Sequence, residues 1–192
     1  LDGMSSGGMF DQLGGGFARY SVDEQWLVPH FEKMLYDNAQ LAVAYLEGYQ
    51  ATGNVNYRRV ARATLDYVLS EMQAPSGGFF SSSDADSEGE EGKFFVFTRE
   101  EIKKCLGEPD ATRFCEFYGV SDAGNFEGKN ILTLWRSQRD VAKQLGISEV
   151  ALNESIERGR ARLLELRASR VAPAVDDKII VSWNGLMIRA LS

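Results

Sequence analysis

Two neighbouring stretches of the chain place apolar residues at helical spacing. Apolar positions recur near every 3.6 residues between 31 and 51, just after Pro29, and Gly53 is typical of the residue that follows a helix. A second pattern of the same kind covers residues 56–72 and ends before Pro75. The link between them is short, so the pattern predicts two antiparallel helices that form a helical hairpin.

A different pattern follows the hairpin. Residues 78–81 and 93–97 are rich in Phe, Ser and Val, and they flank the acidic stretch 84–91. Runs of this composition on either side of a polar turn predict two short strands joined as a surface β-hairpin.

Helical signals return in the second half of the chain. Thr98 followed by Glu101 is the pattern of a capping box, in which the two residues satisfy each other's backbone N–H groups at a helix start. The helices expected here are 98–106, 111–118, 137–145 and 148–168, with a further pattern that starts near Trp183. The fold class we predict is mainly α, with small β-hairpin insertions.

Two short internal repeats suggest that the hairpin is one unit of a repeating fold. The segment 15–21 aligns without gaps with 77–83, and both begin with Gly-Gly-Phe. The segment 32–35 aligns with 177–180 at an offset of 145 residues, which also matches Leu41 with Leu186. Repeated helical hairpins bury their apolar faces against their neighbours, and a closed ring of them would bring the loops at one end around a central hollow.

Composition and charge exclude several classes of protein. The chain has 192 residues, 44% of them hydrophobic, so it has enough apolar material for a folded core. Its net charge of −7 argues against nucleic acid as a partner, and the arginine-rich stretch 158–170 is interspersed with Glu, which predicts a solvated helix face. No apolar run approaches the roughly 20 residues that span a membrane, so we expect no membrane partner.

The cysteines and the first residues bear on the cellular compartment. Cys105 and Cys115 lack CxxC spacing and have no neighbouring histidine, which favours free thiols in a reducing compartment over a metal site. Residues 1–8 are small and polar, unlike a secretory signal. We therefore expect a cytoplasmic location and no bound metal ion.

Four long motifs resemble one known family. Residues 14–37, 83–94, 124–132 and 176–186 are similar to the thioredoxin-domain-containing proteins of the spermatogenesis-associated protein 20 type. That resemblance implies a longer protein, with an N-terminal thioredoxin-like domain followed by an (α/α) six-hairpin toroid like those of N-acylglucosamine 2-epimerases and six-hairpin glycosidases. Residues 1–192 would then be a fragment of the single toroid domain, without the thioredoxin-like domain, and their partners would be the rest of that parent protein.

His30 is the only histidine and the first candidate for chemistry. It lies in Pro-His-Phe-Glu-Lys at the expected start of the first helix, where the positive end of the helix dipole favours the neutral imidazole. A neutral histidine could act as general base and take a proton α to a carbonyl, as a 2-epimerase requires. The alternative is a histidine that is hydrogen-bonded within the core.

Polar residues around His30 complete a candidate pocket. Glu32 and Asp37 are the other candidate catalytic residues, and Lys33 and Tyr36 lie on the neighbouring turns of the same predicted helix. Arg19 and Asp23, on the loop after three glycines, could close over a ligand. A structural Lys33–Asp37 ion pair is the alternative for this helix.

Further candidate substrate-binding residues lie later in the chain. Asp84 and Asp86 belong to the acidic stretch, whose spacing does not fit an EF-hand loop, and whose paired carboxylates could serve glycoside hydrolysis. The alternative there is a solvated loop. Asp177, Lys178, Trp183 and Asn184 combine polar groups with an aromatic platform that suits a sugar, although Trp183 could equally pack in a core.

Three functions remain open at this point. The first is a sugar epimerase or isomerase with His30 as the base, acting on a small carbohydrate. The second is a non-catalytic ligand-binding or partner-docking module. The third is a glycosidase that uses paired carboxylates. The sequence has no GxGxxG motif, and we expect no cofactor.

Overall fold

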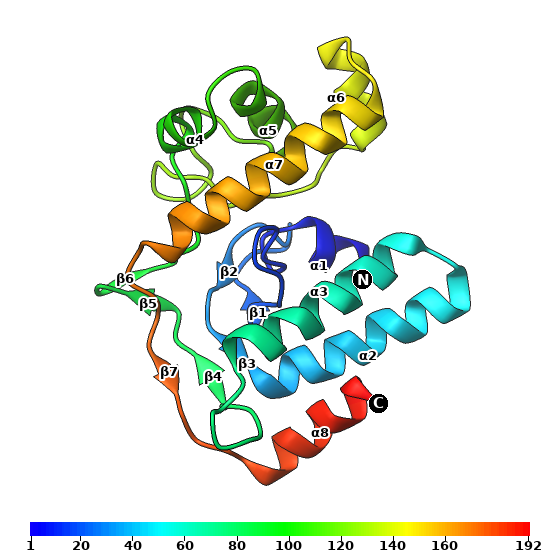
Figure 1. Ribbon diagram of the computed structural model, residues 1–192, viewed down its shortest axis with the longest axis vertical. Coiled ribbons are helices and arrows are strands. Elements are labelled where there is room, and N and C mark those ends of the chain that lie inside the picture. The colour runs from blue at the N-terminus through cyan, green and yellow to red at the C-terminus, as the bar shows by residue number, and fades with distance from the viewer.

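Helices dominate the structure, a computed structural model that describes residues 1–192, and they form two groups joined by short strands (Figure 1). The helices are α1 Asp2–Ser6, α2 Leu35–Thr52, α3 Val55–Glu71, α4 Arg99–Leu106, α5 Asp110–Tyr118, α6 Gln138–Leu145, α7 Glu149–Ala168 and α8 Val181–Leu191. The strands are β1 Tyr20–Ser21, β2 Pro29–His30, β3 Lys33–Met34, β4 Ser82–Ser83, β5 Asp86–Ser87, β6 Glu90–Glu91 and β7 Val175–Asp176. The predicted mainly α fold with small β insertions is confirmed.

The first group is built on the predicted helical hairpin. α2 ends at Gly53 in the left-handed conformation, and Asn54 begins α3 by accepting a hydrogen bond from the backbone N–H of Asn56. α2 and α3 pack against each other, and α8 packs against α2 around buried residues such as Leu35 and Met187. The hairpin therefore has a third helix beside it that comes from the far end of the chain (Figure 1).

The first helix is shorter than predicted because its expected start forms strands. β2 pairs antiparallel with β1, and β3 pairs with β4, so residues 29–34 are extended and α2 begins only at Leu35. The prediction that His30 lies at a helix N-terminus is therefore wrong. β1 precedes β2 by only a short loop, whereas β4 is some fifty residues from β3, and helical periodicity reports neither pairing.

The predicted β-hairpin also differs from the structure. The acidic stretch itself forms the hairpin, with Asp86 opposite Glu91 and Ser87 opposite Glu90. The residues predicted as its strands have other places: 78–81 lead into β4, and residues 92–95 form turns. The strands were misplaced because Gly89 adopts a positive φ and makes the tight turn inside the acidic stretch.

A small sheet connects the helix starts of the first group. Its strand order is β3-β4-β7, all antiparallel, so β4 lies between the strands that precede α2 and α8. Everything between β4 and β7, from the β5–β6 hairpin to α7, is an excursion from this sheet. The sheet thus holds the starts of α2 and α8 side by side, although the segment between β4 and β7 separates them in the chain.

The same hydrogen-bonded clamp occurs at the start of α2 and of α8. Asn38 accepts from the Phe17 N–H (2.7 Å) and donates to the Phe17 carbonyl (3.1 Å) and to the carbonyl four residues before it. Asn184 makes the same three contacts with Phe79 (2.8 and 3.0 Å) and with its own preceding turn. Each phenylalanine follows two glycines at positive φ, a conformation that other residues rarely adopt.

These matching clamps confirm the Gly-Gly-Phe repeat and correct the second alignment. Phe17 and Phe79 are 62 residues apart, as predicted, but Asn38 and Asn184 are 146 residues apart, one more than the predicted offset. With this shift of one residue, Lys33 and Lys178 no longer occupy equivalent positions. Their surroundings differ as well, since Lys33 is buried and Lys178 is exposed. Short sequence matches placed the repeat correctly but not its register.

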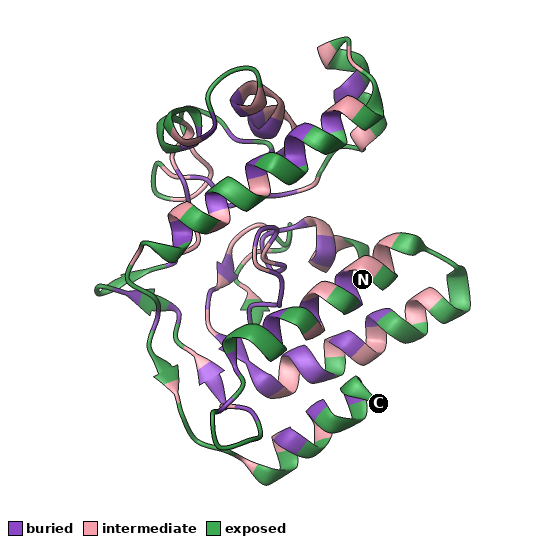
Figure 2. Ribbon diagram, viewed as in Figure 1, coloured by how far each residue is buried: buried purple, intermediate pink, exposed green.

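The second group, α4 to α7, follows the predicted helices closely because local signals mark their ends. The Thr98–Glu101 capping box is present at α4, and Ser137 and Ser148 cap α6 and α7. Buried residues of all four helices, including Phe114 and Leu152, form one hydrophobic cluster. The buried sides of α4, α5 and α7 face one another in Figure 2.

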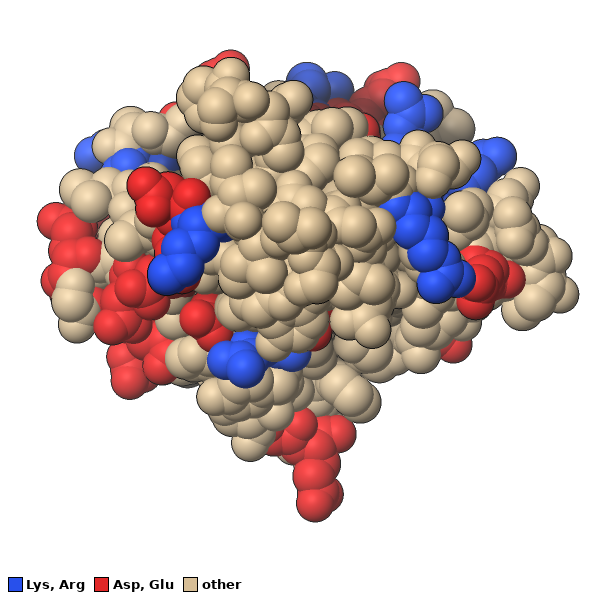
Figure 3. All heavy atoms as spheres, turned by 90° about the horizontal axis from the view of Figure 1, so that it is seen from below, with Lys and Arg blue, Asp and Glu red and all other residues tan.

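One side of α8 remains uncovered in this chain. Val181 is 85% exposed and Ile188 is 64% exposed. The face seen in Figure 3, with α8 on the near side, has a broad uncharged middle, and its charged atoms gather toward the edges.

No helix combines the length and apolar character needed to cross a bilayer.

Candidate functional site

The predicted catalytic residues His30 and Glu32 lie beside Arg19 at the edge of the first group. β1 and β2 place Tyr20 opposite His30, and the Arg19 N–H donates to the Glu32 carbonyl (2.8 Å), so the backbone fixes their spacing. The rings of Tyr20 and His30 stack at 5.0 Å. We call Arg19, Tyr20, His30, Glu32 and Glu91 the His30 cluster.

Glu91 orients the imidazole of His30. The Nδ1 atom of His30 lies 2.8 Å from Oε1 of Glu91, on β6. Because a carboxylate only accepts hydrogen bonds, Nδ1 donates, and the unprotonated nitrogen of the neutral ring is then Nε2. The His30 side chain is 31% exposed, so part of the ring is open to solvent.

Glu32 is held by Arg19 next to that nitrogen. The Arg19 Nη1 atom lies 3.2 Å from Oε2 of Glu32, and the same oxygen is 3.8 Å from Nε2 of His30. An incoming polar group could therefore meet an imidazole, a carboxylate and a guanidinium at once.

Asp37, the third predicted catalytic residue, extends this polar region. Its Oδ2 atom is buried without a hydrogen-bond partner. Burial raises the pKa of Asp37 to about 6, although Arg19 and Tyr36 act in the opposite direction and Glu32 adds to the rise. An ionisable group that exchanges a proton near neutral pH is suited to acid–base work.

Two predicted substrate-binding aromatics lie together at the starts of α2 and α8. Tyr36 and Trp183 meet edge to face, with ring centroids 4.7 Å apart. Both side chains are half-buried. Trp183 also packs against the α2–α3–α8 core, so it serves the fold while leaving part of its ring accessible.

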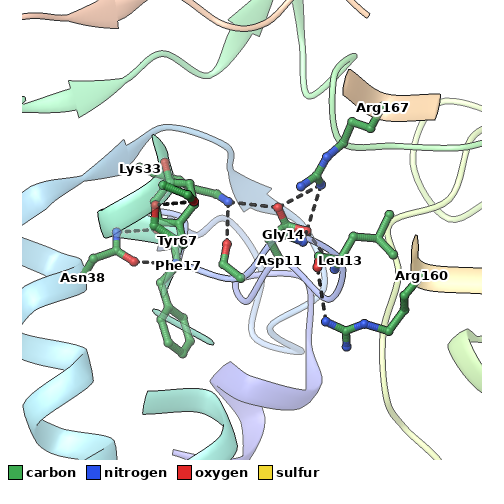
Figure 4. A network of polar contacts seen from close by, with 11 residues as sticks. Asp11, Leu13, Gly14, Phe17, Lys33, Asn38, Tyr67, Arg160 and Arg167 are labelled. Atoms are coloured by element: carbon green, nitrogen blue, oxygen red, sulfur yellow. Dashed lines mark hydrogen bonds and ion pairs between the residues drawn. The ribbon is translucent and has the colours of Figure 1, made fainter. Parts of the chain in front are cut away.

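Lys33 lies in a buried ion network away from the His30 cluster. Its side chain is 3% exposed, and its Nζ atom donates to Oδ2 of Asp11 (3.0 Å) and to the Gly15 carbonyl (2.8 Å). Arg167 reaches the same carboxylate from the other side, at 2.9 Å (Figure 4). The alternative Lys33–Asp37 ion pair is wrong, since Lys33 belongs to β3 and is turned toward Asp11.

The charges of this network stabilise one another. Burial alone would raise the pKa of Asp11, but Arg167 and Lys33 lower it well below its usual range. Burial lowers the pKa of Lys33, and Asp11 opposes that shift. Removing Asp11 would leave both buried cations without their carboxylate, and an uncompensated buried charge costs about 3–5 kcal/mol.

Asp23 and Asn184, both predicted to bind substrate, form hydrogen bonds to the protein backbone instead. Asp23 accepts hydrogen bonds from the N–H groups of Gln25, Leu27 and Val28, and these bonds lower its pKa against the effect of burial. Asn184 is occupied by its clamp on Phe79. The polar atoms of both side chains are thus engaged within the protein.

The remaining predicted residues are exposed and have no hydrogen bond or ion pair with His30 or Glu32, although Asp86 lies opposite Glu91 in the β5–β6 hairpin. Asp84 accepts from the N–H groups of the next two residues, and Asp86 lies on β5 with its side chain exposed. Asp177 is exposed, and Lys178 pairs with Asp176 at 2.6 Å. No three His, Cys, Asp or Glu side chains converge where they could hold a metal ion.

Three residues of these sites were missed by the sequence argument. Glu91 was one acid among several in an acidic stretch, and only the β5–β6 turn brings it to His30. Asp11 lies outside every motif considered. Arg167 was assigned to a solvated helix face, but it is 7% exposed, and Arg160 and Arg170 of the same stretch also donate to backbone carbonyls.

The chain is similar to named animal proteins over nearly its whole length. It is 40% identical to human spermatogenesis-associated protein 20 and 36% identical to the mouse protein of that name, in each case over 96% of this chain. An uncharacterized protein of Caenorhabditis elegans is 33% identical over 100% of the chain. The chain spans 27% of the length of the two mammalian proteins. No protein-family model matches the chain.

Proposed function

We propose that the chain is part of an (α/α) six-hairpin toroid, in a parent protein that also carries an N-terminal thioredoxin-like domain. The similarity to spermatogenesis-associated protein 20 and the motifs of the sequence support this assignment. So does the α2–α3 hairpin with α8 beside α2, since the Asn38 and Asn184 clamps give both helices the same start. The excursion from β4 to β7 is then an insertion between two units.

The function we propose is proton transfer on a small carbohydrate, as in a sugar epimerase or isomerase, at the His30 cluster. The observation that carries it is the 2.8 Å contact between Nδ1 of His30 and Glu91. That contact fixes the tautomer in which Nε2 can accept a proton from the carbon next to a carbonyl. A carboxylate that orients a basic imidazole is a recurring arrangement in acid–base catalysis.

Neighbouring groups supply what such a substrate needs. Arg19 can donate hydrogen bonds to a carbonyl or hydroxyl oxygen, and Glu32 can accept them from hydroxyl groups. Asp37, with its pKa near 6, can return a proton. Tyr20, Tyr36 and Trp183 offer aromatic surface for the apolar face of a sugar ring.

A second candidate is a non-catalytic binding or docking module. It is favoured by the same contact, because His30 and Glu91 tie the β5–β6 hairpin to β2 and could serve only to hold it. The glycosidase hypothesis has less support, since Asp84 accepts hydrogen bonds from the backbone N–H groups of the next two residues and Asp86 is exposed on β5.

Proton NMR in D₂O separates these candidates. The full-length protein is incubated with a panel of reducing sugars and disaccharides, beside the His30→Gln variant. Gln can still donate to Glu91 but cannot act as a base, so proton transfer predicts exchange at carbon 2 that is lost in the variant. Equal exchange in both proteins, or none with folded protein across the panel, would favour the docking module. Bond cleavage without exchange would favour a glycosidase.

A further inference from the structure

A cavity, separate from the His30 cluster, opens between the two helix groups. Its volume is about 480 Å³, within the range of small-molecule sites. One wall comes from α3, through Tyr67 and Glu71. The opposite wall comes from the last turn of α7 and the residues after it, through Arg167 and Arg170. Phe94 and Phe95 add aromatic surface.

The deepest polar groups of this cavity are cations. Lys33 and Arg167 both line it, with side chains 3% and 8% exposed, and both pair with the one carboxylate of Asp11 (Figure 4). Two buried cations therefore share one buried anion, and the only carboxylate that lines the cavity, Glu71, acts on Lys33 from the exposed rim. Burial of an uncompensated charge is unfavourable, so a negatively charged group in the cavity would be stabilised.

Arg167 has hydrogen-bond donors to spare. Only its Nη1 atom bonds to Asp11, at 3.0 and 2.9 Å, and the Nε and Nη2 groups donate to no protein atom. These two N–H groups form the edge of a guanidinium that binds a carboxylate or phosphate through two parallel hydrogen bonds. The guanidinium is held in place by Phe94 and Phe95, whose ring centroids lie 5.3 and 5.6 Å away.

Gly14 contributes by its lack of a side chain. A Cβ atom at this position would overlap Nη2 of Arg167. The backbone of Gly14 has an ordinary φ, so the close approach to Arg167 is what requires glycine here. The arginine is thus placed by packing as well as by its ion pair.

The other polar groups at the cavity suit a hydroxylated ligand. Ser70, Ser83 and Tyr67 bring hydroxyl groups, and Glu71 is exposed at the rim without an ion pair. Arg170 is already paired with Glu101 at 3.2 Å and donates to three backbone carbonyls. It therefore lines the cavity without offering its guanidinium to a ligand.

We propose that this cavity binds a small hydroxylated organic anion, whose carboxylate or phosphate group pairs with the free edge of Arg167. A sugar acid and a sugar phosphate share this chemistry. The aromatic rings would contact the carbon skeleton, and the rim residues would bind its hydroxyl groups. No residue of the His30 cluster lines this cavity, so anion binding here can be tested independently of the proton transfer proposed at His30.

Calorimetric titration of the full-length protein with gluconate, glucose 6-phosphate and glucose tests the proposal. We expect one or both anions to bind and neutral glucose not to bind, with affinity that falls as salt is added. Binding of gluconate alone would identify the carboxylate, and binding of glucose 6-phosphate alone the phosphate. Failure of both anions to bind at millimolar concentration would overturn the proposal.

A matched pair of substitutions on α7 places the binding site. Ala168 is exposed and lines the cavity, whereas Ala161 is exposed on the same helix but does not line it. Ala168→Glu brings a carboxylate to the mouth and should weaken anion binding about tenfold, while Ala161→Glu should leave it unchanged. Equal effects of the two substitutions would overturn the assignment to this cavity, and His30→Gln should bind like the wild type.

Discussion

Asn38→Ala tests the clamp on which the start of α2 depends. Asn38 and Phe17 are both fully buried, and the substitution removes all three hydrogen bonds of the Asn38 side chain. The N–H and carbonyl of Phe17 are then left without partners in a place that water does not reach. An unsatisfied buried polar group costs about 1–3 kcal/mol, so two of them should lower the free energy of unfolding by about 3–4 kcal/mol.

Urea unfolding measures this loss, and two further variants make it specific. Asn184→Ala removes the equivalent clamp, but Asn184 is 9% exposed, so water can partly replace the lost contacts and about half the loss is expected. Gln40→Ala, on the exposed side of α2, should change stability by less than about 0.5 kcal/mol. A loss below about 1 kcal/mol for Asn38→Ala would refute the reasoning, as would equal losses for Asn38 and Gln40.

Three other predictions address the ion network, the pH dependence and the uncovered helix. Asp11→Asn leaves Lys33 and Arg167 without their carboxylate and should cost about 3–5 kcal/mol in chemical unfolding, and a loss under about 1 kcal/mol would contradict the network. Since the pKa of Asp37 is raised to about 6, the native state keeps a proton that the unfolded chain releases near pH 4. As the pH rises from about 4 to about 6, the free energy of unfolding should therefore fall by about 1 kcal/mol after allowance for partial exposure. Asp37→Asn should remove this pH dependence in unfolding experiments. The isolated chain should self-associate through α8, and Ile188→Lys should reduce the association seen by light scattering, whereas a monomeric wild-type chain would argue against this surface.

Local patterns in the sequence were enough to predict most helices. The Thr98–Glu101 capping box and the Ser137 and Ser148 caps are made by residues within three positions of each other, so their signals survive in a single sequence. The Gly-Gly-Phe repeat was also visible, because positive φ at paired glycines restricts the residue type.

Contacts between distant residues were beyond these patterns. His30 is extended because β2 and β3 are paired into separate small sheets, and β3 pairs with a strand some fifty residues away. Lys33 finds its carboxylate 22 positions earlier, and Arg167 meets the same carboxylate 156 positions away. His30 meets Glu91 across 61 positions. No periodicity links such residues, so a sequence argument can propose that His30 and Lys33 matter but not which partners they take.

The state of the His30 ring tests most directly whether Glu91 holds Nδ1–H and leaves Nε2 free to accept a proton. Nitrogen-15 NMR of the imidazole reports which nitrogen carries the proton, and loss of the signal in His30→Gln identifies the residue in the full-length protein. For the neutral ring we expect the Nδ1–H tautomer in the wild type and a mixture of the two tautomers in Glu91→Ala, since no partner then selects one. A ring protonated on Nε2 in the wild type, or a wild-type spectrum unchanged by Glu91→Ala, would contradict it.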